Sequence, residues 1–156
     1  MSSIPDDLAR AFFLERFQDF LAIEKGSSPR TGEAYKLDLE RFVLFASLKN
    51  SRSPLETSAK VLREYVYHLK DLGLAPSSIR RNISALRTYF RFLVNEGHLA
   101  GDPSERLETP KKWRTLPDVL TVEEVEKLLG AVSLDEPLAF RDRAMLEIAY
   151  GAGLRV

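Results

Sequence analysis

The sequence contains no cysteine, and this absence removes several classes of protein at once. Disulfide scaffolds, thiolate metal sites and thiol nucleophiles all require cysteine. Histidine is scarce as well: His68 and His98 lie far apart, without the short spacing of a metal site, so we expect no bound metal and no cofactor. No apolar run approaches the ~20 residues of a membrane span, and the first residues lack the basic-then-apolar order of a signal peptide. We therefore expect a cytoplasmic protein with no membrane partner.

An excess of charge of either sign is also missing, since 23 basic and 23 acidic residues give a net charge of zero. A neutral chain argues against a general binder of polyanions. The charges are unevenly distributed, however: from Ala75 to Asn95 the sequence has four arginines and no acid. A basic surface on a neutral molecule is therefore possible.

Apolar residues recur with the helical period in four stretches of the first hundred residues. Several of these stretches carry end signals, such as Ser28 as an N-cap with Pro29 at the first helical position, or Gly73 after the last helical turn. No strand pattern or repeat stands out. The sequence therefore predicts an all-α protein whose first domain has four helices, over Leu8–Glu24, Pro29–Leu48, Ser58–Leu72 and Pro76–Gly97.

A proline-containing stretch, Gly101–Pro117, lacks the helical period and is predicted to be an interdomain linker. After it, Thr121 and Glu124 have the spacing of a capping box. Two helices are predicted, one to Val132 and one over Leu138–Tyr150, the second with Phe140, Ala144, Met145 and Ile148 facing inward. Two helices are too few for an independent core. We expect a helical domain over residues 1–100, a linker over 101–118, and over 119–156 the start of a domain whose remainder is missing.

One face of the fourth predicted helix carries the clearest chemical signal. At 100° per residue, basic and hydroxyl side chains fall on one stripe opposite the apolar face. Arginine binds phosphate bidentately and reaches base edges, and hydroxyl groups donate to phosphate. A solvated face is the alternative, but such faces usually mix both signs of charge. We therefore predict contact with nucleic acid by Ser77, Arg80, Arg81, Ser84, Arg87, Thr88 and Arg91.

Two smaller basic groups belong to the same prediction. Arg30, Thr31 and Lys36 open the second helix, and two helix faces together suit a module that grips one side of a duplex. In the linker, Lys111, Lys112 and Arg114 flank Trp113 and could follow a phosphate backbone; a solvated linker with one anchoring aromatic residue is equally consistent. The tyrosines are explained by packing or by exposure, and no nucleophile–base pair is visible.

Residues 141–156 read RDRAMLEIAYGAGLRV. This segment resembles the R-D-[KR]-A-[ML]-L helix and the G-L-R-[VI] turn that open the catalytic domain of the tyrosine recombinase, or phage integrase, family. Residues 31–42, TGEAYKLDLERF, and 77–90, SSIRRNISALRTYF, resemble its SAM-like core-binding domain, and Asp102-Pro103-Ser104 resembles its linker. The likeness covers nearly the whole chain and is closest to Xer-type members, especially XerD-like ones, through residues 134–138.

This resemblance implies a C-shaped clamp on duplex DNA, formed by subunits that assemble as a homo- or hetero-tetramer. In the family a tyrosine attacks the scissile phosphate, forms a 3′-phosphotyrosyl link and frees a 5′-hydroxyl, with no metal. Arg155 matches the first catalytic arginine. The second arginine, the lysine, the histidines and the nucleophilic tyrosine have no counterpart in these 156 residues. We therefore expect a chain that binds a recombination site without cleaving it.

Two other functions remain open from the residues alone. The helical domain could bind chiefly another protein, or the chain could be a helical transcription regulator. The salt dependence of DNA binding separates the first alternative from a DNA-binding module. The residues do not distinguish chromosome-dimer resolution from DNA integration, because both use the same chemistry.

Overall fold

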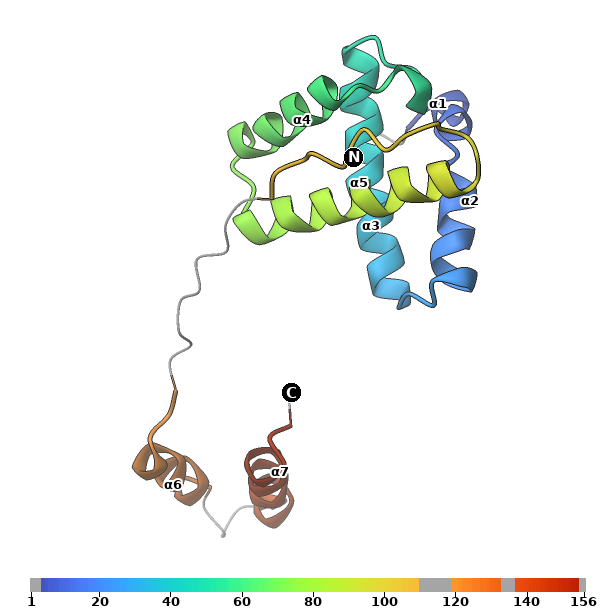
Figure 1. Ribbon diagram of the computed structural model, residues 1–156. Helices are drawn as coiled ribbons and strands as arrows, with labels where there is room; N and C mark the ends of the chain where they lie inside the picture. The colour runs from blue at the N-terminus through green and yellow to red at the C-terminus, as the bar shows by residue number, and fades with distance from the viewer. Residues whose placement is uncertain (1–3, 110–118, 133–136, 155–156) are drawn as a thin grey trace. The chain divides into compact units, whose positions relative to one another are not determined.

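The computed structural model describes residues 4–109, 119–132 and 137–154, and within these ranges every regular element is helical. This confirms the predicted all-α class. The chain divides into two compact units, Met1–Lys112 and Trp113–Val156 (Figure 1). The exact domain and linker ranges stay a prediction.

The first unit contains four longer helical regions, as predicted, with caps where the sequence places them. Ser28 accepts a hydrogen bond from the Thr31 amide at the start of α3, and Ser58 caps α4 in the same way. Gly73 and Gly97 follow α4 and α5 with φ of 71° and 74°, a left-handed conformation that glycine adopts without strain. The elements are α1 (Asp6–Ala11), α2 (Leu14–Asp19), the π-helix η1 (Phe20–Glu24), α3 (Pro29–Leu48), the 3-10 helix η2 (Pro54–Glu56), α4 (Ala59–Asp71) and α5 (Pro76–Asn95).

The core of this unit lies where α3 and α5 cross (Figure 1). Aromatic rings are prominent in it, and those that join α3 to α4 and to α5 at its centre meet edge to face. The ring centroid of Phe42 on α3 lies 5.2 Å from that of Tyr65 on α4 and 6.1 Å from that of Phe90 on α5. Because all three rings are completely buried, they fix the three helices relative to one another.

The first predicted helix, Leu8–Glu24, is wrong as a single helix. The chain breaks it at Phe12 and Phe13, and Phe13 adopts a left-handed φ of 51°. Two long-range contacts explain the break: the Tyr89 hydroxyl donates to the Phe12 carbonyl at 2.7 Å, and the Phe13 ring stacks on His98 at 4.2 Å. Tertiary contacts therefore overrule the helical period here.

The segment that follows α5 packs back on the helices (gold in Figure 1). Leu107 is buried in the core, and Ser104 is fully buried. The Asp102 carboxylate accepts hydrogen bonds from the amide and the hydroxyl of Ser104, which closes a tight turn. Thus residues 102–107, which the sequence assigns to the linker, pack into the core of the first unit.

In the second unit, the structure describes α6 (Val122–Gly130) and α7 (Ala139–Gly151). The predicted capping box at α6 is confirmed: Thr121 and Glu124 each accept a hydrogen bond from the other's amide, at 3.2 and 2.8 Å. The predicted inward face of α7 is wrong in this chain, because Ala144 and three larger apolar residues on it are exposed. Those three are Phe140, Met145 and Ile148, at 74%, 53% and 59%. Over the described ranges, no helix has the length and apolar character needed to cross a membrane.

Candidate nucleic-acid interface

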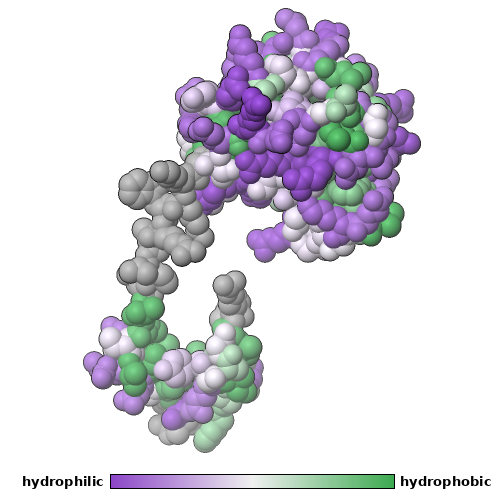
Figure 2. Space-filling model, viewed as in Figure 1, coloured by the Kyte–Doolittle hydropathy of each residue, from purple (hydrophilic) through white to green (hydrophobic). Residues whose placement is uncertain are grey.

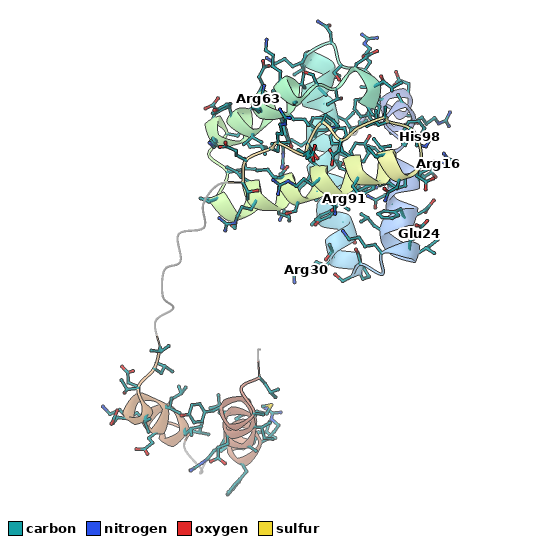
Figure 3. All side chains as sticks on the ribbon, in the orientation of Figure 1. Arg16, Glu24, Arg30, Arg63, Arg91 and His98 are labelled. Atoms are coloured by element: carbon teal, nitrogen blue, oxygen red, sulfur yellow. The ribbon has the colours of Figure 1, made fainter. Side chains whose placement is uncertain are left out.

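The predicted stripe lies on the outer side of α5, and its residues differ in solvent exposure and in whether they bond to other segments. Ser77, Ser84 and Arg91 are exposed, and Arg80 is half-buried. These four occupy the middle of the stripe on a 100° helical projection. Figure 3 shows Arg91 on α5. Arg81 and Thr88 fall on one edge of the stripe, and Arg87 falls on the other.

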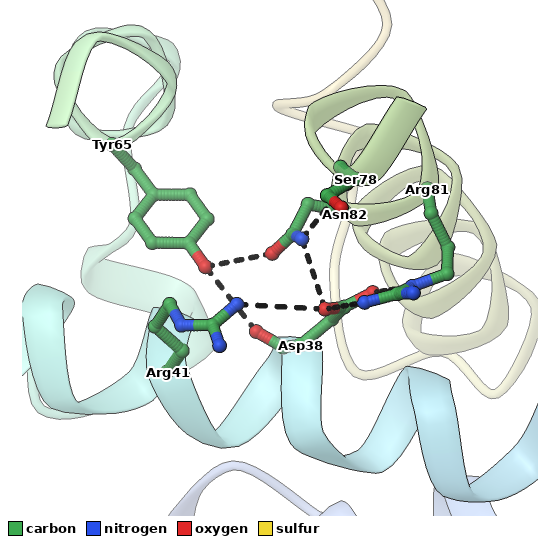
Figure 4. Close-up of polar contacts among 6 residues, drawn as sticks. All are labelled: Asp38, Arg41, Tyr65, Ser78, Arg81 and Asn82. Carbon is green, nitrogen blue, oxygen red and sulfur yellow. Dashed lines mark hydrogen bonds and ion pairs between the residues drawn. The ribbon is translucent and has the colours of Figure 1, made fainter. Parts of the chain in front are cut away.

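Arg81 is bound to α3 by a bidentate ion pair. Its Nε donates to Asp38 Oδ2 at 2.8 Å and its Nη2 to Asp38 Oδ1 at 3.0 Å (Figure 4). The Asp38 side chain is almost completely buried, whereas Arg81 is about half exposed. Arg81 therefore has a structural partner, which the sequence prediction did not foresee.

Asp38 is the centre of a wider polar network beneath the surface (Figure 4). Asn82 donates to Asp38 Oδ1 at 2.9 Å and accepts from the Tyr65 hydroxyl at 2.9 Å. Arg41 Nη1 lies 3.6 Å from the same carboxylate oxygen, so two guanidinium groups flank one acid. Burial raises the pKa of Tyr65 well above its ordinary value, and its hydroxyl therefore stays a neutral donor. The network joins α3, α4 and α5 at the base of the stripe.

The other contacts at the edges of the stripe also tie it to neighbouring segments. Arg87 Nη2 donates to the Leu107 carbonyl and so holds the segment after α5. On the opposite edge, Lys25 Nζ donates to the Thr88 hydroxyl at 3.2 Å and lies 5.9 Å from the Tyr35 ring centroid. Lys25 adds a cation beside the stripe that the sequence analysis did not select, because it falls outside the helices expected to contact DNA.

The predicted patch on α3 does not form one cluster. Arg30 is exposed near the N-terminus of α3 (Figure 3). Thr31 Oγ1 lies 2.9 Å from the hydroxyl of the capping residue Ser28. Lys36 lines a hollow with residues of α1 and α2, whereas Asp38, two residues later, faces α5. Lys36 therefore lies on the side of α3 away from Asp38, because two residues span about 200° of a helix.

The remaining predicted residues lie outside the part of the chain that the structure describes. They are Lys111, Lys112 and Arg114 in the linker prediction and Arg155, the match to a catalytic arginine. No group of acids and histidines suited to a metal occurs among the described residues.

The polar network could have been suspected from two residues out of pattern. Asp38 adjoins the buried stripe of α3, and Asn82 lies beside Ile79 and Ile83 on the apolar face of α5. A charged or amide side chain in such a position needs a partner, since an unpaired one is costly to bury. The identity of the partner depends on how the helices cross, which the local sequence does not define.

Comparison with known proteins decides the family. Residues 14–97, more than half of the chain, match the model of the phage integrase N-terminal SAM-like domain. The chain belongs to the tyrosine recombinase, or phage integrase, family. It is 38% identical over 144 residues to "Tyrosine recombinase XerD" of Listeria innocua, which covers 92% of this chain and 48% of the relative. It is 36% identical over 150 residues to "Tyrosine recombinase XerC" of Salmonella typhi, which covers 96% and 50%.

A third relative, "Tyrosine recombinase XerD" of Oceanobacillus iheyensis, is 37% identical over 146 residues, with 93% and 49% covered. The predicted resemblance to Xer-type tyrosine recombinases is thus confirmed, and so is the SAM-like four-helix class of the first domain. This chain spans about half the length of the curated relatives it matches.

Proposed function

We propose that this chain is the DNA-binding N-terminal part of a site-specific recombinase, and that it grips a duplex recombination site through the outer face of α5. The protein to which it corresponds cuts and rejoins DNA through a 3′-phosphotyrosyl intermediate. The chain itself lacks a counterpart of the nucleophile and binds without cleaving. The observation that carries this proposal is an acid-free stripe of arginine and hydroxyl side chains on α5, whose edge residues are bonded to neighbouring segments.

The chemistry of the stripe suits a phosphate backbone. Arg80 and Arg91 are permanently charged, and Ser77 and Ser84 are exposed donors on the same face. Arg81 forms an ion pair with Asp38, so we give it a positioning role. Because its side chain is half exposed, it also adds to the local positive potential. The bonds at the two edges hold α5 against its neighbours before DNA arrives, and a preformed helix surface lowers the entropic cost of binding.

Several finer features belong to the same proposal. The partners are a duplex recombination site and other recombinase subunits, assembled in the full protein as a homo- or hetero-tetramer on DNA. The cellular task is chromosome-dimer resolution or DNA integration in the cytoplasm. Residues 1–100 form the core-binding domain, 101–118 the linker and 119–156 the start of the catalytic domain, in which Arg155 contacts the scissile phosphate. The basic linker residues contact the DNA phosphate backbone; they are Lys111, Lys112 and Arg114.

A titration of short DNA duplexes at 50 and 200 mM salt tests the DNA contact. The double variant Arg80→Ala, Arg91→Ala is expected to lower the slope of log K against log salt by about two units, one for each arginine that binds a phosphate in the parent. Loss of affinity for one preferred sequence, by about 1–3 kcal/mol, identifies an arginine that reads a base. Arg10 and Arg52 are exposed outside the stripe, so Arg10→Ala, Arg52→Ala is a control with the same change in charge.

Thermal melting verifies that both double variants fold like the parent. Equal salt slopes for the stripe variant and the control variant, or a parent that shows no salt-dependent binding, would contradict the proposal and favour a protein partner. A denaturant-resistant protein–DNA adduct would contradict the statement that the chain does not cleave.

A further inference from the structure

A second basic face lies on α4, outside the residues assigned to DNA so far. Lys60, Arg63, Tyr67 and Lys70 recur at spacings of three, four and three residues, which places them on one side of the helix. All four side chains are exposed, and Figure 3 shows Arg63 on this helix. Two acids adjoin this face along α4: Glu64, which is paired with Lys49 at 2.9 Å, and Asp71, the exposed last residue of the helix, next to Lys70.

This α4 face borders a hollow that includes the segment after α5. The hollow has a volume of about 230 Å³ and is lined by side chains of α4 and by Arg106, Leu107 and Glu108. Three cations, Arg63, Lys70 and Arg106, therefore face one acid, Glu108. Lys70 Nζ lies 5.1 Å from the centroid of the Tyr67 ring, which holds the ammonium group against an exposed aromatic face.

The hollow is continuous with the α5 stripe through Leu107. Arg87, on the edge of the stripe, donates to the carbonyl of Leu107, and the residues on either side of Leu107 line the hollow beside α4. The gold segment in Figure 1 accordingly runs between α4 and α5. A duplex that lies on the α5 stripe and extends across this segment meets the α4 face next.

We infer that the α4 face, with Arg106, is a second contact for the phosphate backbone of the same duplex, flanking the α5 stripe. This inference rests on the proposed function, because it takes the occupant of the α5 stripe to be DNA. The four side-chain cations of this surface, Lys60, Arg63, Lys70 and Arg106, match a run of phosphates, and the Tyr67 hydroxyl adds a neutral donor. The alternative partner is an acidic protein segment. Such a segment has no regularly spaced phosphates, so binding of duplex DNA and binding of an acidic peptide can be compared to distinguish the two partners.

The test compares three double variants of the full chain, each of which removes two cations. They are Arg63→Ala, Lys70→Ala on the α4 face, Arg80→Ala, Arg91→Ala on the α5 stripe, and the control Arg10→Ala, Arg52→Ala. Each is titrated with one duplex long enough to extend beyond the α5 contact, and with a shorter duplex, at 50 and 200 mM salt. Polyglutamate at the same ionic strength serves as the acidic-peptide probe.

With the long duplex, the α4 variant is expected to lose about two units of salt slope, so that its ratio of affinities at 50 and 200 mM falls about tenfold. With the short duplex it is expected to bind like the control variant, since the flanking phosphates are absent. Tyr67→Phe, which keeps the ring under Lys70, retains the salt slope of the parent.

An α4 variant that matches the control on the long duplex, while the α5 variant loses slope, would overturn this inference alone and leave the proposed function intact. Loss of polyglutamate binding by the α4 variant, with the duplex slopes unchanged, would assign the face to a protein partner instead. A parent chain that binds no duplex overturns both proposals.

Discussion

In the first unit each long helix buries an apolar face, whereas α6 and α7 in the second unit leave most of theirs in contact with solvent. Phe42, Tyr65 and Phe90 are completely buried in the first unit. Among the described residues of the second unit, only Val125 and Ala139 are buried, and Phe140 is 74% exposed. Figure 2 shows apolar side chains on the surface of these two helices. The comparison shows that the end signals in the sequence can define a helix even where its apolar face is not packed in a core.

The end signals of α6 illustrate this separation. Its capping box satisfies amide groups at the helix start through residues only three positions apart, so no other element is needed. The α3–α4–α5 core, in contrast, depends on contacts between residues far apart in sequence, such as Tyr89 with Phe12. Substitutions in the two units should therefore have different effects.

The largest difference is expected for removal of an aromatic ring. Phe90→Ala leaves a cavity in the closed core of the first unit and should lower the free energy of unfolding by about 3–5 kcal/mol. Phe140→Ala removes an exposed ring of the same size and should change it by less than about 0.5 kcal/mol. Denaturant unfolding followed by circular dichroism measures both. Similar losses for the two variants would show that α7 buries Phe140 in solution, for instance against a second copy of the chain.

A smaller effect is expected from alkaline pH, and it should be confined to the first unit. Burial raises the pKa of Tyr65 and of Tyr89 in the folded state, while in the unfolded chain a tyrosine ionises near pH 10. Stability is therefore fully present below about pH 10 and falls above it by about 1.4 kcal/mol per pH unit for each phenol.

Chemical unfolding of the first unit at several pH values above neutrality measures this slope. Tyr89→Phe removes one of the two phenols and should halve the slope, and Tyr67→Phe, at an exposed position, is the control. An unchanged slope in Tyr89→Phe would mean that this phenol does not remain buried and neutral at high pH.

The smallest effect concerns a single cap in each unit. Thr121→Ala at α6 and Ser28→Ala at α3 should each cost about 1 kcal/mol of helix stability. In α3 the buried face resists fraying, so amide exchange should accelerate only in the first turn. In α6 exchange should accelerate throughout the helix, and NMR detection of single amides distinguishes the two patterns. Whole-helix acceleration in α3 would contradict the difference drawn between the units.

The local sequence could predict much of the fold, and the same comparison explains what it could not predict. The caps at Ser28 and Thr121 and the buried stripes of α3, α4 and α5 follow from nearby residues, and all are confirmed. The break at Phe13 depends on His98, which is 85 residues away in the sequence. The ion pair between α5 and α3 joins Arg81 to Asp38, which is 43 residues away. The proposed DNA contacts are predicted by residue type, but which arginines are free for DNA depends on these long-range partners.

The two bonds at the edges of the α5 stripe have a mechanical consequence. A helix held only by apolar packing can roll slightly about its axis, and a roll of 10° moves a point at the helix surface, about 6 Å from the axis, by about 1 Å. The bonds of Arg81 to Asp38 and of Arg87 to the Leu107 carbonyl oppose rolling in opposite directions, because they leave the helix on opposite sides. In the DNA contact that we propose, α5 would therefore present Arg80 and Arg91 at a fixed angle to the phosphates, and binding would depend on the pitch of the duplex as well as on its charge.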